Sequence, residues 1–597
     1  MACLEPFDHG ASGRMRSTLA AAALALTCCL GGGTVWAKPV TVKIVAFNDF
    51  HGNLAPPRQS ITAPLPGGGT AAVPAGGAAY LVSAIKRLEA RSPNHVTVAA
   101  GDLIGASPLL SALFLDEPSI EAMNLAGLDF SAVGNHELDR SRPELQRLAH
   151  GGCQKLTTKQ PCAVDKDFTG ANFHYLTANI LTETGAPLFD PYAIRTFGKG
   201  KGRVRVAFIG LTLKSAPEIV SPSGVAGLSF KDEADTVNAL VPKLRKAGAD
   251  AIVLLIHQGG VTTVGYNDKS CAGFTGAILP ILDRLDSRVD VVLSGHTHEA
   301  YVCDYGRINP NKPFLLTSAG LNGKLLTDVT LTIDPAHHRV TGKRADNVIV
   351  QGEAYTGNRG PVPLQPTFPV FPADPAAAAL VARYAAAAAP LASQTAGHLT
   401  GAATRVETLG RETVIGDLVA DAELAATRDT KMGGAQIAMI NAGGVRAELI
   451  PGAGGAVAYD QLFTVQPFGD ALIVVSLTGR QIKDALEAEF PGANGQPGTI
   501  DSLMVSSGAR YSFDAARPVG QRIVALTLDG KPVEDATAYR VTLNTFLAQG
   551  GGGFEALAKG TQPLGGPQDI DALQAYLSGA PVTPPTPDRV TNLSARP

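Results

Sequence analysis

The chain has 597 residues, a formal net charge of −3, and 45% hydrophobic and 17% charged residues. A chain of this length exceeds what one hydrophobic core organises, so at least two domains are expected. The composition is that of an ordinary globular protein, and the near-neutral charge, without a basic patch, argues against a nucleic-acid polymer as partner.

The first 37 residues read as a secretory signal peptide. Two arginines precede an apolar run at residues 19–30, and Val35-Trp36-Ala37 resembles a cleavage site. Translation from Met15 would leave out the acidic residues that are unusual in such a leader. The apolar run is shorter than the ~20 residues that span a bilayer, so a membrane anchor is the weaker alternative. Lipid attachment at Cys28 or Cys29 is weaker still, and we expect a periplasmic or secreted protein.

Four cysteines follow the leader: Cys153, Cys162, Cys271 and Cys303. An even number of cysteines in an exported protein predicts two disulfides. Three pairings are possible, and we favour Cys153 with Cys162 and Cys271 with Cys303, because each pair brackets a loop beside a polar motif. A zinc site built of cysteines is the weaker alternative, since the chain has no close Cys-x-x-Cys pair.

Five apolar runs read as buried strands of a parallel sheet, and helix-like segments lie between them. This alternation predicts strand-helix-strand units with right-handed crossovers, which place the ends of the strands on one sheet edge. The expected strands are residues 42–47, 96–100, 130–133, 251–256 and 290–293, and the expected helices are residues 80–90, 119–126, 231–247 and 275–285.

A polar motif begins where each of these apolar runs stops. Divalent metals used in hydrolysis bind carboxylate, imidazole and amide groups, and two such metals ~3.5–4 Å apart need one shared ligand. A single His or Asp after a strand is more often a loop residue or helix cap, but five motifs in this order favour a dinuclear site. The expected ligands are Asp102 as the bridge, Asp49, His51 and His298 for one metal, and Asn135, His257 and His296 for the other.

Such a metal pair would activate water for direct in-line attack on a phosphate ester. His136 follows Asn135 and is expected to point into the same pocket without binding metal. Asp139, three residues on, can orient this imidazole, so we assign His136 to transition-state stabilisation or leaving-group protonation. Glu137 is expected to face solvent. The ligand types do not distinguish Zn, Mn, Fe and Co.

The composition changes after about residue 345. Residues 352–375 are rich in proline, and the alanine-rich residues 374–391 read as a helix that connects two domains. Strands and helices then mix, as at residues 416–426 and 478–490, which predicts a second α/β domain. The expected division is a signal peptide at 1–37, a first domain at 38–345, a connector at 346–395, a second domain at 396–580 and an extended tail at 581–597.

The motifs resemble those of the calcineurin-like metallophosphatases. From about residue 40 to 580 the chain resembles their exported two-domain branch of 5′-nucleotidases, UDP-sugar hydrolases and 2′,3′-cyclic-nucleotide phosphodiesterases. The resemblance implies an α/β protein with an N-terminal metallophosphatase sandwich of β-sheets flanked by helices, a linker helix and a C-terminal α/β nucleotide-binding domain. It also implies the same ligand roles as those argued above, and a C-terminal domain that swings between loading and delivering substrate.

Motifs in the second half look like the substrate-binding motifs of this branch. By resemblance, Arg411, Asn441 and Arg446 contact phosphate or neighbouring polar groups, while Phe468 and Phe546 sandwich the base. Guanidinium groups suit phosphate and an aromatic sandwich suits any planar base. The structural alternatives are core aromatics and a surface salt bridge.

One departure from the family concerns the glycines after Phe546. The family runs Gly-Gly-Asp-Gly with the Asp on the ribose hydroxyls, whereas Gly552 stands at the Asp position here. Weaker ribose recognition is expected, so cyclic nucleotides or a broader range of phosphoesters become plausible substrates.

The motifs together predict an exported metal-dependent phosphoesterase that hydrolyses nucleotides, namely nucleoside 5′-monophosphates, 2′,3′-cyclic or 3′-nucleotides, to nucleoside and phosphate. The alternatives are a dimetal hydrolase of another ester, such as UDP-sugars or a thiohydrolase substrate, and a non-catalytic nucleotide-binding protein. A pure binding protein would not need His136. The sequence does not predict the oligomeric state.

Overall fold

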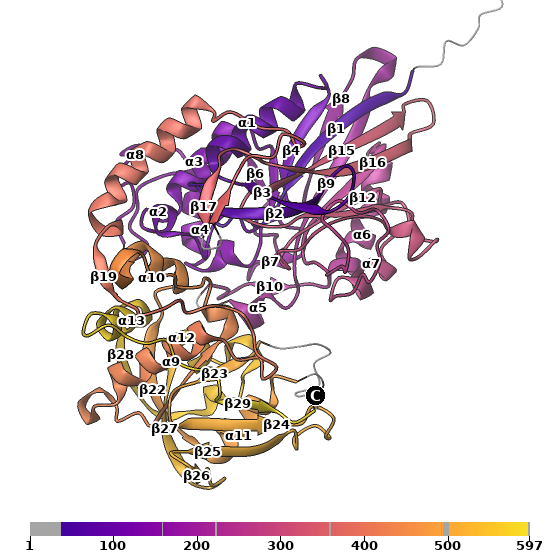
Figure 1. Cartoon of the computed structure of the whole chain (residues 1–597). Coiled ribbons are helices and arrows are strands. Elements are labelled where there is room, and N and C mark those ends of the chain that lie inside the picture. Colours follow the sequence, from indigo (N-terminus) through magenta and orange to yellow (C-terminus); the bar gives the residue numbers. More distant parts are fainter. Residues whose placement is uncertain are drawn as a thin grey trace, which may run out of the picture.

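The computed structural model describes residues 38–157, 159–220, 224–357, 360–490, 492 and 501–594. It is a two-domain α/β fold in which the N-terminal part, with two large sheets, lies next to a C-terminal part with two smaller ones (Figure 1). The predicted signal peptide lies outside the described residues.

The first large sheet contains the strands that precede the first three polar motifs. Strands β1, β4, β5 and β6 run parallel, and β15 and β16 extend the sheet in antiparallel fashion on the other side of β1. The strand order is β16 (Arg339–Ile349), β15 (Leu325–Asp334), β1 (Val40–Phe47), β4 (His95–Ala99), β5 (Phe130–Ala132) and β6 (His174–Leu176).

The second large sheet contains the strands that precede the last two motifs. Its four central strands are parallel and its two edge strands are antiparallel. The order is β13 (Ala300–Asp304), β14 (Leu315–Ala319), β12 (Val291–Ser294), β11 (Ala251–His257), β9 (Val204–Thr212) and β8 (Tyr192–Phe197). The expectation of one sheet edge for all five motifs was therefore wrong, because the motifs follow strands of two sheets.

The two sheets pack face to face, and the alternation of side chains along β1 shows why. Val42, Ile44 and Ala46 join the core between the sheets, whereas Val45 and Phe47 point to the opposite face and join the core under the helices. A strand that is buried on both faces reads as a continuous apolar run, so periodicity alone did not separate the two sheets. The sandwich of helix-flanked sheets implied by the family resemblance is confirmed.

Helices cover the outer face of each sheet. The first sheet is covered by α1 (Ala78–Glu89) and α3 (Glu117–Ala126), and the second by α6 (Glu233–Lys246) and α7 (Leu279–Arg284). These helices match the predicted ones to within a few residues at most ends. The side chain of Asp232 caps α6 by accepting a hydrogen bond from the Asp235 amide at 3.0 Å, which fixes its start.

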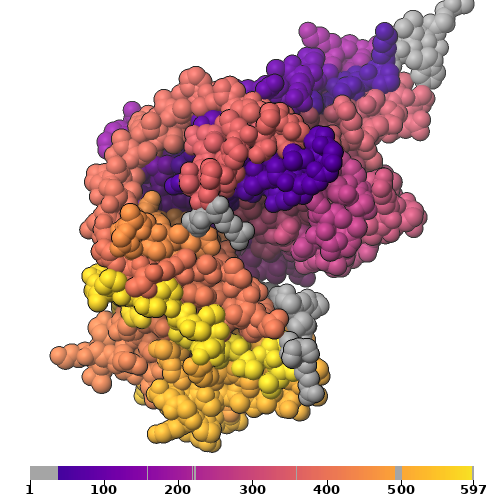
Figure 2. All heavy atoms as spheres, viewed as in Figure 1, coloured from indigo at the N-terminus to yellow at the C-terminus, as the bar shows by residue number. Residues whose placement is uncertain are grey.

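The connector is the alanine-rich helix α8 (Pro375–Ala392), whose first turn is capped by the side chain of Asp374. It runs along one side of the molecule from one part to the other (Figures 1 and 2). By length and composition α8 is the described helix that could cross a membrane. In this fold, however, Leu380 and Tyr384 lie in the hydrophobic core, and the Tyr384 hydroxyl donates to Glu121 at 2.8 Å.

The C-terminal part contains a five-stranded and a four-stranded sheet. The strand order of the five-stranded sheet is β23 (Leu503–Val505), β20 (Ile437–Asn441), β27 (Ala538–Asn544), β22 (Ala471–Thr478) and β28 (Thr561–Gln568). The order of the four-stranded sheet is β26 (Lys531–Pro532), β25 (Ile523–Leu528), β24 (Ala509–Phe513) and β29 (Val590–Asn592). The predicted tail supplies β29, which pairs with β24. The main helices are α9 (Val414–Thr427), α10 (Tyr459–Val465), α11 (Gly479–Glu487), α12 (Thr545–Ala548) and α13 (Asp569–Leu577).

Both predicted disulfides are confirmed, one between Cys153 and Cys162 and the other between Cys271 and Cys303. The second one ties the segment after β11 to β13, and so to the edge of the second sheet.

Candidate metal centre

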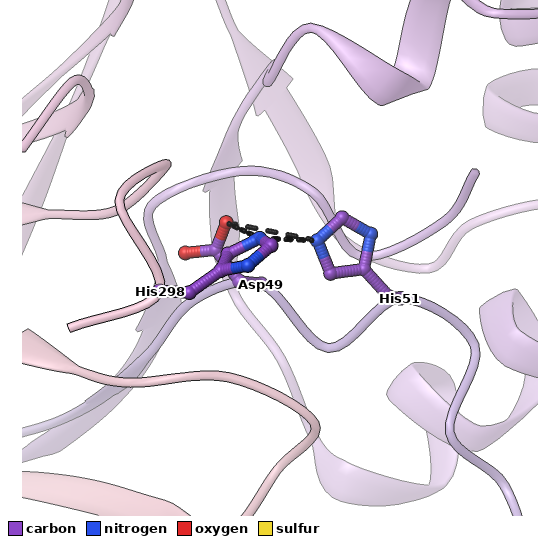
Figure 3. A group of neighbouring side chains, drawn as sticks. All are labelled: Asp49, His51 and His298. Carbon is purple, nitrogen blue, oxygen red and sulfur yellow. Dashed lines mark hydrogen bonds and ion pairs between the residues drawn. The ribbon is translucent and has the colours of Figure 1, made fainter. Parts of the chain in front are cut away.

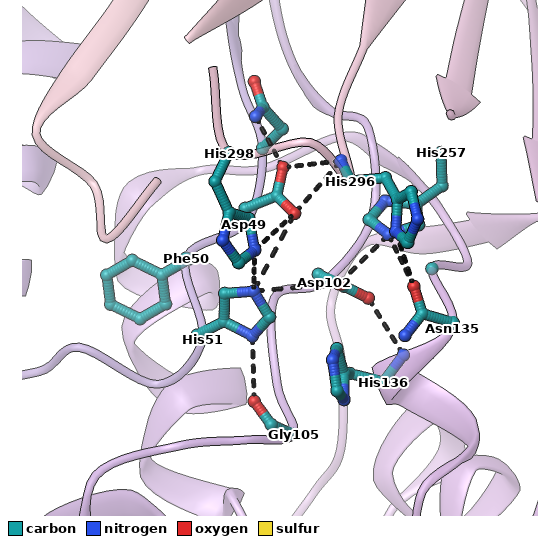
Figure 4. Close-up of polar contacts among 12 residues, drawn as sticks. Asp49, Phe50, His51, Asp102, Gly105, Asn135, His136, His257, His296 and His298 are labelled. Carbon is teal, nitrogen blue, oxygen red and sulfur yellow. Dashed lines mark hydrogen bonds and ion pairs between the residues drawn. The ribbon is translucent and has the colours of Figure 1, made fainter. Parts of the chain in front are cut away.

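The loops after β1, β4, β5 and β12 meet the end of β11 at one end of the sandwich. They bring together all seven residues predicted to bind metal (Figure 4). The carboxylate and imidazole ligand atoms of Asp49, His51 and His298 lie within 4.8 Å of one another (Figure 3). Those of Asp49, Asp102 and His257 also lie within 4.8 Å of one another. Asn135 and His296 complete the group, since the Asn135 carbonyl oxygen lies 3.1 Å from Nδ1 of His296 and 3.0 Å from Nε2 of His257.

Backbone carbonyls fix how two of the imidazoles face this centre. The Nδ1 atom of His51 donates to the carbonyl of Gly105 at 3.0 Å, and Nδ1 of His257 donates to the carbonyl of Ala100 at 2.8 Å. A carbonyl can only accept, so in both rings Nε2 points inward. For His51, Nε2 lies 3.7 Å from a carboxylate oxygen of Asp102 and 3.1 Å from Nε2 of His298.

The donor set fits a cation. Burial lowers the pKa of His51 to about 3, and burial together with the charge of His257 lowers the pKa of His296 to about 3. These rings are therefore neutral at pH 7, as metal ligands must be. Two buried carboxylates, Asp49 and Asp102, face the same point without a lysine or arginine bonded to them among the described residues.

His257 is the exception in this group. Burial opposes its charge, but the carboxylate of Asp102, 3.0 Å away, raises the pKa of His257 to about 10. In the absence of metal a proton on this ring balances the carboxylates. Because a metal needs the neutral imidazole, binding at this position would release that proton.

Five of the seven predicted ligands have a left-handed backbone. This conformation is uncommon for residues with a side chain and costs about 1–3 kcal/mol each where the surroundings impose it. Such residues cluster at functional sites, so the backbone supports the prediction made from the motifs. The residues and their φ angles are Asp49 at 49°, His51 at 47°, Asp102 at 52°, His296 at 72° and His298 at 62°.

His136 lies beside this group, with Nδ1 2.8 Å from a carboxylate oxygen of Asp139. Burial opposes its charge, but the carboxylates of Asp139 and Asp102 raise the pKa of His136 above its ordinary value. The ring is stacked on Phe468 with 5.8 Å between ring centroids. This arrangement places an imidazole whose charged form is favoured by two carboxylates next to the candidate metal ligands.

The expectation that Glu137 faces solvent was wrong. Glu137 is 3% exposed, and its carboxylate accepts hydrogen bonds from the amides of Asp102 at 2.9 Å, Leu103 at 2.7 Å and Gly134 at 2.7 Å. It therefore ties the loop after β5 to the loop after β4. Its position in the short 3-10 helix η1 (His136–Leu138) turns it away from the surface, which strand and loop periodicity could not predict.

Asn48 is a second supporting residue that the motif contained without a predicted role. Its side-chain amide donates to Asp49 at 2.6 Å and to the carbonyl of Gly320 at 2.7 Å. Its carbonyl oxygen accepts from the Ala319 amide at 2.8 Å. Asn48 thus holds Asp49 against the loop after β14.

Two of the residues predicted to bind substrate reach the metal end from the C-terminal part. Phe468 stacks on His136, and the guanidinium of Arg446 lies 5.9 Å from the centre of the Phe468 ring. The charge of Arg446 acts on four of the site imidazoles, those of His51, His136, His296 and His298.

The other three contact groups of the C-terminal part itself. Arg411 donates to the backbone carbonyl of Glu489 at 3.1 Å, and Asn441 donates to Asp501 at 2.8 Å. Phe546 is partly buried against the glycine turn, where a side chain at Gly551 would lie 2.4 Å from its ring. No ring contact between Phe468 and Phe546 occurs among the described residues, so the predicted sandwich stays a prediction.

The sandwich and its donor set define a metallophosphoesterase. The calcineurin-like phosphoesterase family matches residues 42–300, and the C-terminal domain of 5′-nucleotidases matches residues 394–559. The chain therefore belongs to the calcineurin-like phosphoesterases, in the branch that carries a 5′-nucleotidase C-terminal domain.

Several known proteins are similar to the chain over most of its length. It is 28% identical to the endonuclease YhcR of Bacillus subtilis over 90% of the chain, and 28% identical to the cell wall protein Lmo0130 of Listeria monocytogenes over 88%. The chain spans 40% and 65% of the lengths of these two relatives. Among solved structures, a 5′-nucleotidase precursor from Thermus thermophilus is 26% identical with a TM-score of 0.71, over 93% of this chain and 100% of that one.

Proposed function

We propose that the protein is a metal-dependent phosphoesterase that hydrolyses nucleotides to nucleoside and phosphate. The observation that carries this proposal is the contact between the two parts at the donor set. The imidazole of His136 from one part is stacked on the aromatic ring of Phe468 from the other, with Arg446 beside it. Membership of the phosphoesterase family supports the reaction class, and the 5′-nucleotidase structure from Thermus thermophilus supports nucleotides as substrates.

We assign the seven clustered residues as ligands of two divalent metals, with Asp102 shared. When bound, the metals would supply positive charge to the phosphoryl oxygens and activate the attacking water. The remaining chemistry belongs to side chains of this chain. Arg446 is placed to pair with phosphate oxygens, and Phe468 offers an aromatic face to a base. We assign His136, whose charged form Asp139 favours, to stabilising the transition state or protonating the leaving oxygen.

We also propose that the protein is exported. The two disulfides persist in oxidising compartments, and one of the relatives is a cell wall protein. The assignment of residues 1–37 as a signal peptide and the periplasmic or secreted location remain predictions.

A substrate panel tests the function. Residues 38–597 would be freed of metal and assayed for phosphate or nucleoside release from AMP, 3′-AMP, 2′,3′-cyclic AMP and UDP-glucose, with Mn²⁺ or Zn²⁺ restored. We expect metal-dependent turnover of at least one nucleotide, and a His136→Ala variant that turns over about 10²–10⁴ times more slowly with its metals retained. A metal-loaded protein inactive on every nucleotide would overturn the proposal.

The same panel resolves the consequence of Gly552. This residue has φ 69° in the glycine turn after Phe546 and contributes no carboxylate. Preference for the cyclic or 3′ substrate over AMP would make that glycine a change of specificity, whereas efficient AMP turnover would show that ribose is bound by other groups.

A further inference from the structure

The turn after β20 holds an amide whose orientation is fixed from one side only. Asn441 ends β20, and its side-chain nitrogen donates to a carboxylate oxygen of Asp501 at 2.8 Å. The same oxygen of Asp501 accepts the Gly443 amide at 2.6 Å, and its other oxygen accepts the Ser502 amide at 3.1 Å. A carboxylate that takes these bonds can only accept, so the NH₂ group of Asn441 must face Asp501.

The opposite end of the Asn441 amide is an unpaired acceptor. Asn441 is 4% exposed, and among the described residues its carbonyl oxygen has no hydrogen-bond partner. A buried acceptor left without a donor costs about 1–3 kcal/mol, so such a group calls for a partner that binds there. Gly444 keeps the approach open, because a side chain at that position would lie 2.9 Å from this oxygen.

The location of this oxygen connects it to the site already described. Asn441 and Val445 flank the short 3-10 helix η5 (Ala442–Gly444), and Arg446 follows directly. The carboxylates of Asp102, Asp139 and Asp501 all oppose the lowering of the Arg446 pKa by burial. Backbone pairing fixes the position of Asn441 relative to Asp501, since Asn441 lies opposite Leu503 and the Ala442 amide donates to the Ser502 carbonyl at 2.9 Å.

We propose that Asp501 is a specificity-determining positioning residue, which holds Asn441 so that its carbonyl oxygen receives a hydrogen-bond donor of the nucleoside. This inference rests on the proposed nucleotide substrate. It assigns Asn441 to a hydroxyl or amino group rather than to phosphate, whose oxygens accept hydrogen bonds. It also gives the site a means of recognising the nucleoside that does not need a carboxylate at Gly552.

The test compares ligands that differ by one donor. Purine riboside 5′-monophosphate lacks the amino group of AMP, and 2′-deoxy-AMP and 3′-deoxy-AMP each lack one hydroxyl. We expect the protein to prefer AMP over one of these analogues by about tenfold in kcat/KM. The analogue that is rejected identifies the donor as base or ribose. Equal kcat/KM for all four would overturn the inference while leaving the proposed function intact.

Variants then distinguish a role of Asp501 in positioning Asn441 from a role in supporting the fold alone. Asp501→Ala and Asn441→Ala should each bring the preference close to unity, and the double variant should lose no more than either single one, because the two residues act as a unit. Asp501→Asn, which conserves volume but sets an N–H group against a backbone amide, should lose part of the preference. The matched control is Asp535→Ala, an exposed carboxylate paired with Lys483, which should keep it.

Binding of nucleosides to the metal-free protein provides a readout that is independent of hydrolysis. Adenosine and its analogues, measured by calorimetry, should follow the same order in the wild type and lose it in Asp501→Ala. If no nucleotide is hydrolysed but this order is found, the positioning role stands and the proposed reaction fails. An Asp501→Ala variant that melts like the wild type and retains the full preference would overturn the positioning role.

Discussion

The proposed metal ligands of the N-terminal part and the residues proposed to bind substrate in the C-terminal part differ in how completely the fold assembles them. In the first, seven side chains from five loops converge, and backbone carbonyls and a buried glutamate hold them in place. In the second, Arg446 and Phe468 reach the site, while Arg411, Asn441 and Phe546 bond to or pack against their own domain. The proposed metal ligands are thus gathered in one place, whereas the residues proposed to bind substrate are spread over the C-terminal part.

Removing the shared carboxylate is the strongest test of the proposed metal ligands. Asp102→Ala should lower turnover by at least about a thousandfold and abolish binding of metal, because the Asp102 carboxylate lies 3.7 Å from Nε2 of His51 and 3.0 Å from Nε2 of His257, one proposed ligand of each metal. Phosphate release and elemental analysis of the purified protein measure the two effects. Asp535→Ala serves as control, and an Asp102→Ala variant that keeps its metals and activity would show that the site is elsewhere.

Arg446→Ala should separate recognition from metal binding. We expect kcat/KM to fall by about a hundredfold, since a guanidinium that pairs with phosphate is lost, with metal content unchanged. Steady-state kinetics with parallel metal analysis distinguishes the two halves of the site. Loss of metal in this variant would mean that the C-terminal part contributes to metal binding. The two parts would then not differ in the way described.

Glu137→Gln examines the support beneath the metal ligands. The carboxylate accepts three backbone amides, and an amide group cannot accept all three without turning an N–H toward one of them. Because supporting residues of this kind tune metal affinity, we expect affinity to fall by about 10–100-fold. Titration of the metal-free protein with Zn²⁺ measures this, with the exposed Glu353→Gln as control. Unchanged affinity would reduce Glu137 to a packing residue.

Glu489 gives the smallest expected effect and concerns the substrate half. Burial raises the pKa of Glu489 to about 8, against its ordinary value near 4.3, although Arg411 opposes this. The folded state then binds a proton that the unfolded state has lost between these two values, so stability falls as pH rises from about 4.3 to 8. Glu489→Gln should raise the melting temperature at pH 8 and leave it unchanged near pH 4. If the melting temperatures of the two proteins changed with pH in the same way, this prediction would be contradicted.

The convergence of the seven proposed ligands could be predicted from the sequence because its signals are local. Each ligand of the set follows an apolar strand, and a parallel strand carries its end to the same edge as its neighbours. The division of the strands between two sheets was not predictable, since a strand buried on both faces shows no alternation. Glu137 was misplaced because its burial depends on the short helix that follows Asn135.

The substrate half could be predicted only by resemblance. Neither charge nor periodicity marks Phe468 as the ring that lies against His136, because the contact joins residues more than three hundred positions apart. Asp501 belongs to no recognised sequence motif. Its proposed role is inferred only from its hydrogen bond to Asn441, whose strand β20 pairs with β23 two residues after Asp501.

The left-handed backbone at five of the proposed ligands implies a compromise between stability and activity. Glycine would adopt those φ angles without strain, but glycine binds no metal. The chain therefore keeps residues that weaken the folded state and compensates with the surrounding sandwich, and bound metal would add stability that the empty loops lack. A search for more heat-resistant variants would find gains at Asp49, His51, Asp102, His296 and His298, and every such gain would be an inactive protein.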